Sequence, residues 1–254
     1  MRPIQSLVHS RTRVTSRYAL MPLEGFPTSR LPGWESASVR VLASPSLGAA
    51  FVQLLIDLPS GSTGSFSADT QNHETIETFY FVLSGTGRSS GNVAANDLTP
   101  GSFMLVSASD AVSIIADTDL RLLILRKRYE PTSKHPAAIS YVGNESSVEK
   151  EVWEGNPHAL LQKLIPDDFA FDMAMNIFTF SPGHGLPVVE THVMEHGLLF
   201  LSGKGVYFLD GTWMEVEQDD FIWMGPFCPQ SFYATGPTPS RYIYYKNVNR
   251  DIHI

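Results

Sequence analysis

The chain has 254 residues, a formal net charge of −8 and a single cysteine, Cys228. The acidic balance, with no basic cluster longer than 126–128, argues against nucleic-acid binding. One cysteine allows no disulfide within the chain, and no apolar run is long enough for a signal peptide or a membrane span. We therefore expect a cytoplasmic protein with neither a nucleic-acid nor a membrane partner.

The first half of the chain predicts an arm followed by a barrel. Residues 1–45 are rich in proline and alternate little between apolar and polar residues, which indicates an irregular N-terminal arm. Residues 46–130 hold short β-rich runs separated by turns with Gly, Pro, Asn and Ser, which predict a first small β-barrel. Its expected strands are 51–58, 79–83, 102–106, 112–115 and 120–125.

The second half predicts a linker and another barrel. Residues 131–168 are the expected linker, in which 149–162 is the one stretch that favours a helix. Residues 169–254 return to short strands. The strands expected there are 173–180, 188–192, 196–202, 205–209, 220–224 and 241–245, with a further strand starting at Gln230. Many short strands without regular helices between them are typical of sandwiches and barrels, so the predicted fold class is all-β.

The two barrels are related by an internal repeat. An offset of 118 positions carries 84–87 (SGTG) onto 202–205 (SGKG), and it also carries 101–103 (GSF) onto 219–221 (DDF). One offset that serves both segments indicates the duplication of a single β-rich unit. We therefore predict two tandem small barrels.

Four side chains in the second barrel suit a metal site. Glu190 and His192 are two residues apart on an expected strand and share a face, because side chains on a strand alternate. His196 opens the next strand, and Gln230 opens a later one. Burying these groups without a partner would be costly, so we predict that they bind a metal. A carboxylate, an amide oxygen and two imidazoles suit Mn²⁺ or Fe²⁺ better than a thiolate-seeking ion.

The first copy lacks this set of ligands. The offset places Asn72, Glu74, Thr78 and Val112 at the positions of Glu190, His192, His196 and Gln230. His73 and Glu77 are each one residue out of register, and such a slip moves a strand side chain to the opposite face. We therefore expect these two to be outward-facing polar groups or members of a surface network, with a single metal site per chain.

The duplicated barrel, with ligands split between an early strand pair and a later strand, resembles the bicupin family. The ligand order Glu, His, His, Gln resembles that of the (S)-ureidoglycine aminohydrolases, manganese bicupins of purine and allantoin degradation. The segments that carry the resemblance are 196–205 (HGLLFLSGKG), 221–230 (FIWMGPFCPQ), 240–250 (SRYIYYKNVNR) and 18–34 (YALMPLEGFPTSRLPGW).

The resemblance implies a bicupin fold and the hydrolysis of (S)-ureidoglycine, a small anionic ureido compound. It implies Glu190, His192, His196 and Gln230 as ligands of one Mn²⁺ per chain. Substrate contacts from Tyr207, Tyr242 and Lys246 are also implied, with Lys246 and Tyr242 catalytic, and we expect a homo-oligomer. The family adds an acidic residue from the segment between the barrels, for which Glu130 and Glu145 are the candidates here.

The residues by themselves leave other readings open. Tyr242 and Lys246 share a strand face, and a solvated strand face would also account for Lys246. Another cupin enzyme, an oxygenase or isomerase using Fe²⁺, would consume oxygen or rearrange a small acid instead of releasing ammonia. A storage or small-ligand-binding bicupin would hold no tightly bound metal.

Overall fold

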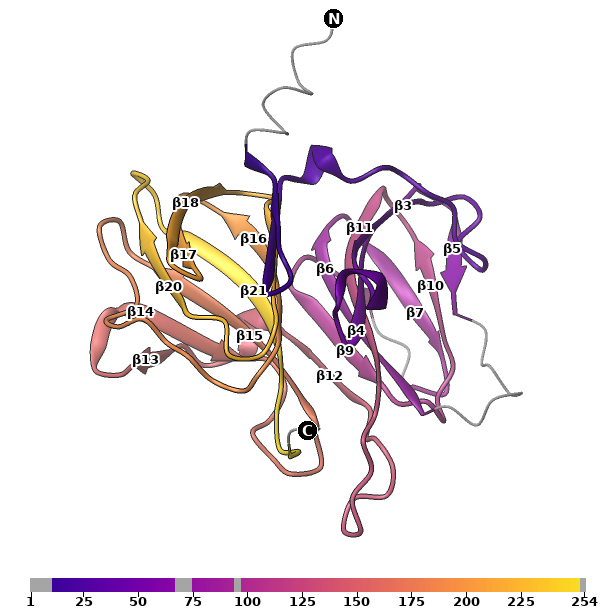
Figure 1. Cartoon of the computed structure of the whole chain (residues 1–254). Coiled ribbons are helices and arrows are strands. Elements are labelled where there is room, and N and C mark those ends of the chain that lie inside the picture. The colour runs from indigo at the N-terminus through magenta and orange to yellow at the C-terminus, as the bar shows by residue number, and fades with distance from the viewer. Residues whose placement is uncertain (1–10, 67–74, 94–96, 252–254) are drawn as a thin grey trace, which may run out of the picture. The chain divides into compact units, whose positions relative to one another are not determined.

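The computed structural model describes residues 11–66, 75–93 and 97–251, and it confirms the predicted all-β fold. The elements in this part of the chain are twenty-one strands and three short 3-10 helices, arranged in two compact units (Figure 1). We call residues 27–147 with 168–172 the N-terminal unit. The C-terminal unit consists of the described residues up to 26, of 148–167, and of those from 173 on. No helix in the described ranges has the length and apolar character needed to cross a membrane.

The N-terminal unit contains two antiparallel sheets. Its elements are β3 (Ser38–Ala43), η2 (Pro45–Leu47), β4 (Phe51–Leu58), β5 (Thr63–Ser65), β6 (Ile76–Ser84), β7 (Gly87–Gly91), β8 (Asp97–Leu98), β9 (Ser102–Val106), β10 (Val112–Ala116), β11 (Leu120–Arg128), β12 (Tyr141–Asn144) and η3 (Glu145–Ser147). One sheet has the order β12-β9-β6-β11-β4-β3 and the other β5-β10-β7-β8. Apolar side chains from both sheets form one core cluster, as expected for a closed two-layer barrel.

The C-terminal unit repeats this plan with more strands. Its elements are β1 (Arg13–Val14), β2 (Tyr18–Met21), η1 (Leu23–Gly25), β13 (Glu151–Trp153), β14 (Asn156–Lys163), β15 (Met173–Phe180), β16 (His196–Ser202), β17 (Lys204–Leu209), β18 (Thr212–Glu217), β19 (Phe221–Met224), β20 (Gln230–Ala234) and β21 (Ser240–Asn247). The large sheet has the order β1-β2-β19-β16-β21-β15-β14-β13, and the small sheet β18-β17-β20. Phe200, Tyr207 and Phe232 meet in the core between them.

Backbone details support the predicted repeat. Gly85 and Gly203 both have a positive φ, 83° and 77°, in the turns that follow β6 and β16. The amide of Gly101 donates to the carbonyl of Val82 at 2.9 Å, and 118 positions later the amide of Asp219 donates to that of Phe200 at 3.0 Å. The strands β10 and β20 start at equivalent positions, as expected from the offset.

Two expectations about the connecting segments were wrong. The first 45 residues are not one irregular arm, because β2 pairs with β19 in the C-terminal unit and β3 pairs with β4 in the N-terminal unit. Residues 131–168 are not a separate linker with a helix, because β12 joins the N-terminal unit while β13 and β14 extend the large C-terminal sheet. Pairing within the sheets decided these segments, with a partner far away in sequence for β2 and neighbouring partners for β3, β13 and β14, and local composition does not report it.

A buried charged cluster holds residues 168–172 in the N-terminal unit. Lys127 Nζ is 2.5 Å from Asp172 Oδ2 and 3.6 Å from Glu77 Oε1, and all three side chains are buried. Asp172 Oδ2 also accepts the backbone N–H of Glu130 at 2.7 Å. Glu77 is therefore not the outward-facing group that the sequence led us to expect, whereas His73 lies outside the described residues. Burial, together with the hydrogen bond and negative charge of Asp172, raises the pKa of Glu77 to about 9.

This raised pKa predicts how stability varies with pH. Between the ordinary carboxyl value and about 9, the folded chain binds a proton at Glu77 that the unfolded chain has released. The free energy of unfolding therefore falls as pH rises through that window. We expect Glu77→Gln to flatten the dependence in denaturant titrations while staying within about 1 kcal/mol of the wild type at pH 6. The exposed Glu149→Gln is the control, and an unchanged slope in Glu77→Gln would contradict a protonated Glu77.

Candidate metal centre and active site

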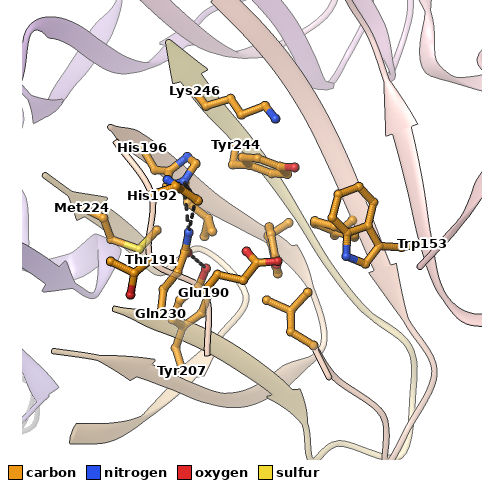
Figure 2. Close-up of a pocket in the computed structure, with 14 residues that line it drawn as sticks. Trp153, Glu190, Thr191, His192, His196, Tyr207, Met224, Gln230, Tyr244 and Lys246 are labelled. Carbon is orange, nitrogen blue, oxygen red and sulfur yellow. Dashed lines mark hydrogen bonds between the residues drawn. The ribbon is translucent and has the colours of Figure 1, made fainter. Parts of the chain in front are cut away.

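A cavity of about 320 Å³ lies inside the C-terminal unit. It is lined by all seven side chains that the sequence implied as metal ligands or substrate contacts. They are Glu190, His192, His196, Tyr207, Gln230, Tyr242 and Lys246 (Figure 2). These side chains come from both sheets. His196 on β16 and Tyr242 and Lys246 on β21 belong to the large sheet, whereas Tyr207 on β17 and Gln230 on β20 belong to the small one. The two layers of the barrel therefore form the walls of one polar site.

Backbone pairing sets Glu190 directly beside Gln230. The amide of Glu190 donates to the carbonyl of Gln230 at 2.8 Å, and the reverse bond measures 2.9 Å. This isolated bridge replaces the continuous strand expected over 188–192. Directly opposed residues of an antiparallel pair project from the same face, and both side chains line the cavity. The pairing thus accounts for a carboxylate and an amide, 40 positions apart in sequence, in one site.

Three nitrogen atoms form the centre of the site. Gln230 Nε2 lies 3.0 Å from His192 Nε2 and 3.1 Å from His196 Nε2, and the two imidazole atoms are 3.2 Å apart. His196 Nδ1 donates to the backbone carbonyl of Tyr245 at 2.9 Å, which leaves its Nε2 as a lone-pair donor toward the centre. The side-chain amide of Gln230 therefore donates to the imidazoles in this arrangement.

Burial keeps both imidazoles neutral. Removal from water, with the neighbouring charge of His192, lowers the pKa of His196 to about 3. Burial, followed by the positive charge of Lys246, also lowers the pKa of His192. A neutral imidazole offers a lone pair, which is the form that binds metal ions.

Tyrosine hydroxyls extend this network. Tyr207 donates to Gln230 Oε1 at 2.8 Å, and the hydroxyl groups of Tyr242 and Tyr207 are hydrogen-bonded to each other. Both rings are buried, and burial raises the pKa of each far above its usual value. These two tyrosines consequently fix the orientation of the amide that faces the imidazoles.

Lys246 provides the positive charge of the site. It is paired across the strands with His196 on one side and Ala174 on the other, and in Figure 2 its side chain extends away from the imidazoles toward the side of the Tyr244 hydroxyl. Burial lowers the pKa of Lys246, while the negative charges of Asp167 and Glu190 oppose that shift. The same burial raises the pKa of Glu190, and the charge of Glu154 adds to that effect. The cavity thus carries a cation and a carboxylate that are both poorly solvated.

The donors at this centre fit a divalent metal ion. Two ligands at right angles around an ion with bonds of roughly 2.1 Å lie about 3.0 Å apart, which matches the separations of the three central atoms. Turning the amide of Gln230 by 180° replaces its nitrogen by its oxygen and leaves three lone-pair donors there.

Glu190 requires a different rotamer to join them. Figure 2 shows its carboxylate turned toward the Trp153 side of the cavity, away from the imidazoles. In agreement with this orientation, no group of three or more His, Cys, Asp or Glu residues converges on one point within the described ranges. Glu190 nevertheless lies on the face that it shares with Gln230.

The site also contains residues that the sequence did not single out. Trp153, Tyr244 and the apolar side chains of Phe178, Leu186, Leu198 and Met224 complete most of the lining. Tyr244 lies between Tyr242 and Lys246 on the same face of one strand, so strand periodicity was a signal that could have identified it. Trp153 lay in the segment expected to be helical, where no such signal was available. The linker candidates Glu130 and Glu145 belong to the N-terminal unit and do not line this cavity.

The chain is similar along most of its length to proteins of known name. No family model matches the chain. The (S)-ureidoglycine aminohydrolase of Escherichia coli K12 is 34% identical over 245 residues, which cover 93% of this chain and 90% of that protein. The Arabidopsis thaliana enzyme of the same name is 33% identical over 240 residues, covering 92% and 76%.

Solved structures confirm the predicted cupin fold. Protein Ylba of E. coli superposes with a TM-score of 0.84 at 32% identity, covering 98% of this chain and 99% of that one. A cupin 2 conserved barrel domain protein of Leptotrichia buccalis gives a TM-score of 0.61 at 16% identity over 90% of this chain and 96% of its own, and this shows the fold alone.

The position of Gln230 leads to a prediction about metal affinity. Gln230→Leu keeps approximate volume but removes the amide that faces both imidazoles. We expect the affinity for Mn²⁺ to fall by at least roughly tenfold, with the fold intact in circular dichroism. The control is Gln53→Leu, which removes a buried amide from the N-terminal unit. Equal metal affinity in the two variants would show that Gln230 is not a ligand.

Proposed function

The chain belongs to the (S)-ureidoglycine aminohydrolase family, and on that premise we propose that it hydrolyses (S)-ureidoglycine to (S)-ureidoglycolate and ammonia in purine degradation. The observation that carries the proposal is the cluster of two neutral imidazoles and one amide, beside Lys246, inside a cavity of about 320 Å³. The fold alone would also permit an oxygenase, an isomerase or a binding protein. The identity to named aminohydrolases along most of the chain favours the hydrolase.

We propose that the site holds one Mn²⁺ per chain, with Glu190, His192, His196 and Gln230 as its ligands. Carboxylate, amide and imidazole donors suit Mn²⁺, and Fe²⁺ or another divalent ion of similar preference is the alternative. Such an ion, when bound, stabilises negative charge and orients a substrate that carries both a carboxylate and an amine. With the amide turned so that its oxygen faces the imidazoles, Gln230 Nε2–H would donate to the hydroxyl oxygen of Tyr207, which in the present orientation donates to Oε1.

The charged and polar side chains of the site would bind and orient the substrate. Lys246 offers a cation to the substrate carboxylate, in a cavity where little water weakens the attraction. Tyr207 and Tyr242 lie behind Gln230 and shape the opposite wall. Holding the reacting carbon in one orientation lowers the entropic part of the barrier, and it also selects one stereoisomer.

We propose that Lys246 carries the proton during the exchange of ammonia for water. The bond between carbon and the amine nitrogen breaks with help from the lone pair of the ureido nitrogen, and a bond from the same carbon to the oxygen of water replaces it. One proton of that water must reach the departing nitrogen. Burial lowers the pKa of Lys246 below that of an ordinary lysine, so its ammonium group gives up a proton to the departing nitrogen more readily and can regain one from the water.

The remaining expectations stay predictions. A homo-oligomer is checked by light scattering of the purified protein, and the cytoplasmic location by fractionation of cells that express it.

Metal loading and turnover test the proposed function together. The purified protein should bind about one Mn²⁺ per chain, and freshly generated (S)-ureidoglycine should release ammonia faster with Mn²⁺ than after chelation. The double variant Glu190→Ala, His192→Ala should lose both the metal and the activity. Two tightly bound ions per chain, or an ion that survives the double change, would refute the ligand assignment. Wild-type protein loaded with metal that releases no ammonia would refute the reaction.

Substitutions at Lys246 separate its charge from its chemistry. Lys246→Arg keeps the positive charge but loses the titratable amine, so a proton carrier should lose kcat almost as severely as in Lys246→Met. We expect both losses to be roughly 100-fold or more, with unchanged metal content. The exposed Lys204→Arg is the control. Near-normal turnover in Lys246→Arg would limit the residue to anchoring the carboxylate.

A further inference from the structure

Two hydrogen-bond donors on one wall of the cavity lack acceptors. The indole nitrogen of Trp153 is buried and has no hydrogen-bond partner within the described residues. The hydroxyl of Tyr244 accepts a bond from Asn176 Nδ2 at 3.2 Å, and no acceptor for its own proton occurs in the described part of the chain. Buried donors are rarely left unpaired. A ligand that supplies an acceptor atom would therefore give both donors a hydrogen-bond partner.

Aromatic contacts hold these donors in place. Phe178 stacks on Tyr244 with ring centroids 5.6 Å apart and an angle of 7°, and it meets Trp153 edge-on at 5.5 Å and 86°. Tyr244 also contacts the ring of His196 edge-on at 5.6 Å. In Figure 2 the indole nitrogen of Trp153 and the hydroxyl of Tyr244 both face the interior of the cavity. The wall is therefore preorganised, which lowers the entropic cost of binding.

The other two tyrosines of the cavity belong to the hydrogen-bond network of Gln230. Tyr207 is hydrogen-bonded to the side chain of Gln230, and the hydroxyls of Tyr242 and Tyr207 are hydrogen-bonded to each other. Tyr244 is thus the cavity tyrosine whose hydroxyl lies outside that network. Asn176 Nδ2–H donates to the hydroxyl oxygen of Tyr244, so the proton of that hydroxyl must point away from Asn176.

The distribution of charge identifies the part of the ligand that this wall accepts. Trp153 and Tyr244 are neutral donors packed against the ring of Phe178. Glu190, whose carboxylate is turned toward Trp153 in Figure 2, leaves this wall when it joins the metal ligands as proposed, and Lys246 remains the cation of the cavity. Neutral donors in apolar surroundings suit a carbonyl oxygen better than a carboxylate, whose desolvation would be costly without a cation. A carbonyl oxygen can accept two bonds in its plane.

We propose that Trp153 Nε1–H and Tyr244 O–H donate to the carbonyl oxygen of the ureido group, and that Asn176 is a positioning residue for Tyr244. This assignment rests on the proposed function, because it divides the substrate into a carboxylate end near Lys246 and a ureido end at the wall. Trp153 and Tyr244 then determine specificity for ureido compounds over plain amino or hydroxy acids.

Binding of a stable ureido acid tests the assignment. Ureidoacetate has the carboxylate and the ureido group but no amine to lose, and glycolate lacks the ureido group. We expect Trp153→Phe and Tyr244→Phe each to weaken the binding of ureidoacetate to the Mn²⁺-loaded protein by roughly five- to tenfold in calorimetry. Glycolate binding and metal content should stay at the wild-type level. Two exposed residues of the same unit provide matched controls, Trp213→Phe and Tyr233→Phe.

Several results would overturn the assignment. Ureidoacetate affinity within about twofold of the wild type in both variants, or wild-type protein that does not bind ureidoacetate, would do so. An equal loss for glycolate would show that the two residues only shape the cavity. The reaction itself is judged separately, by ammonia release from wild-type protein, so a failed reaction and a failed ureido contact give different results.

A double-mutant cycle tests the role of Asn176. If Asn176 acts through Tyr244, Asn176→Ala weakens ureidoacetate binding in the wild type but adds no loss to Tyr244→Phe. If Asn176→Ala does not fold, Asn176→Ser takes its place in the same cycle. Additive losses would show that Asn176 does not act by orienting the hydroxyl of Tyr244.

Discussion

The side-chain amide of Gln230 is the group on which the organisation of the site depends. It contacts both imidazoles and accepts a hydrogen bond from Tyr207, while its backbone pairs with that of Glu190. These partners come from three segments of the C-terminal unit: the connection before β16 holds Glu190 and His192, β16 holds His196 and β17 holds Tyr207. An amide in a cavity that is poor in water must have all its bonds satisfied, so its position constrains the histidines and the tyrosine together.

The same constraint explains why the two barrels differ in their interiors although they share a plan. In the N-terminal unit Thr78 occupies the strand position of His196, and the residue paired with it is Arg126 where the other unit has Lys246. Arg126 lies over the ring of Phe66 with 3.9 Å to its centroid. Barrel architecture follows from apolar periodicity and glycine turns, which both copies kept. The chemistry depends on a few inward positions that changed independently.

The sequence predicted the fold class, the repeat and the core strands because these are local, periodic signals. Alternation was used to place Glu190 and His192 on one face of a strand that the structure does not form, yet both side chains and that of His196 line the cavity. The short segments that complete each sheet were missed because their strand character comes from pairing, with a distant partner for β2 and a neighbouring one for β13. Trp153 was missed because β13 becomes a strand only when it is paired with β14.

The pairing of β2 with β19 has a consequence for how the protein is made. The N-terminal unit is complete once residue 172 has left the ribosome, and it can fold while synthesis continues. The strand at 18–21 is translated long before its partner at 221–224 and has to wait for it. Its apolar residues stay exposed during that interval, which is a risk of aggregation. The sheet that carries His196 and Lys246 is therefore finished only after β19 and β21 have been synthesised.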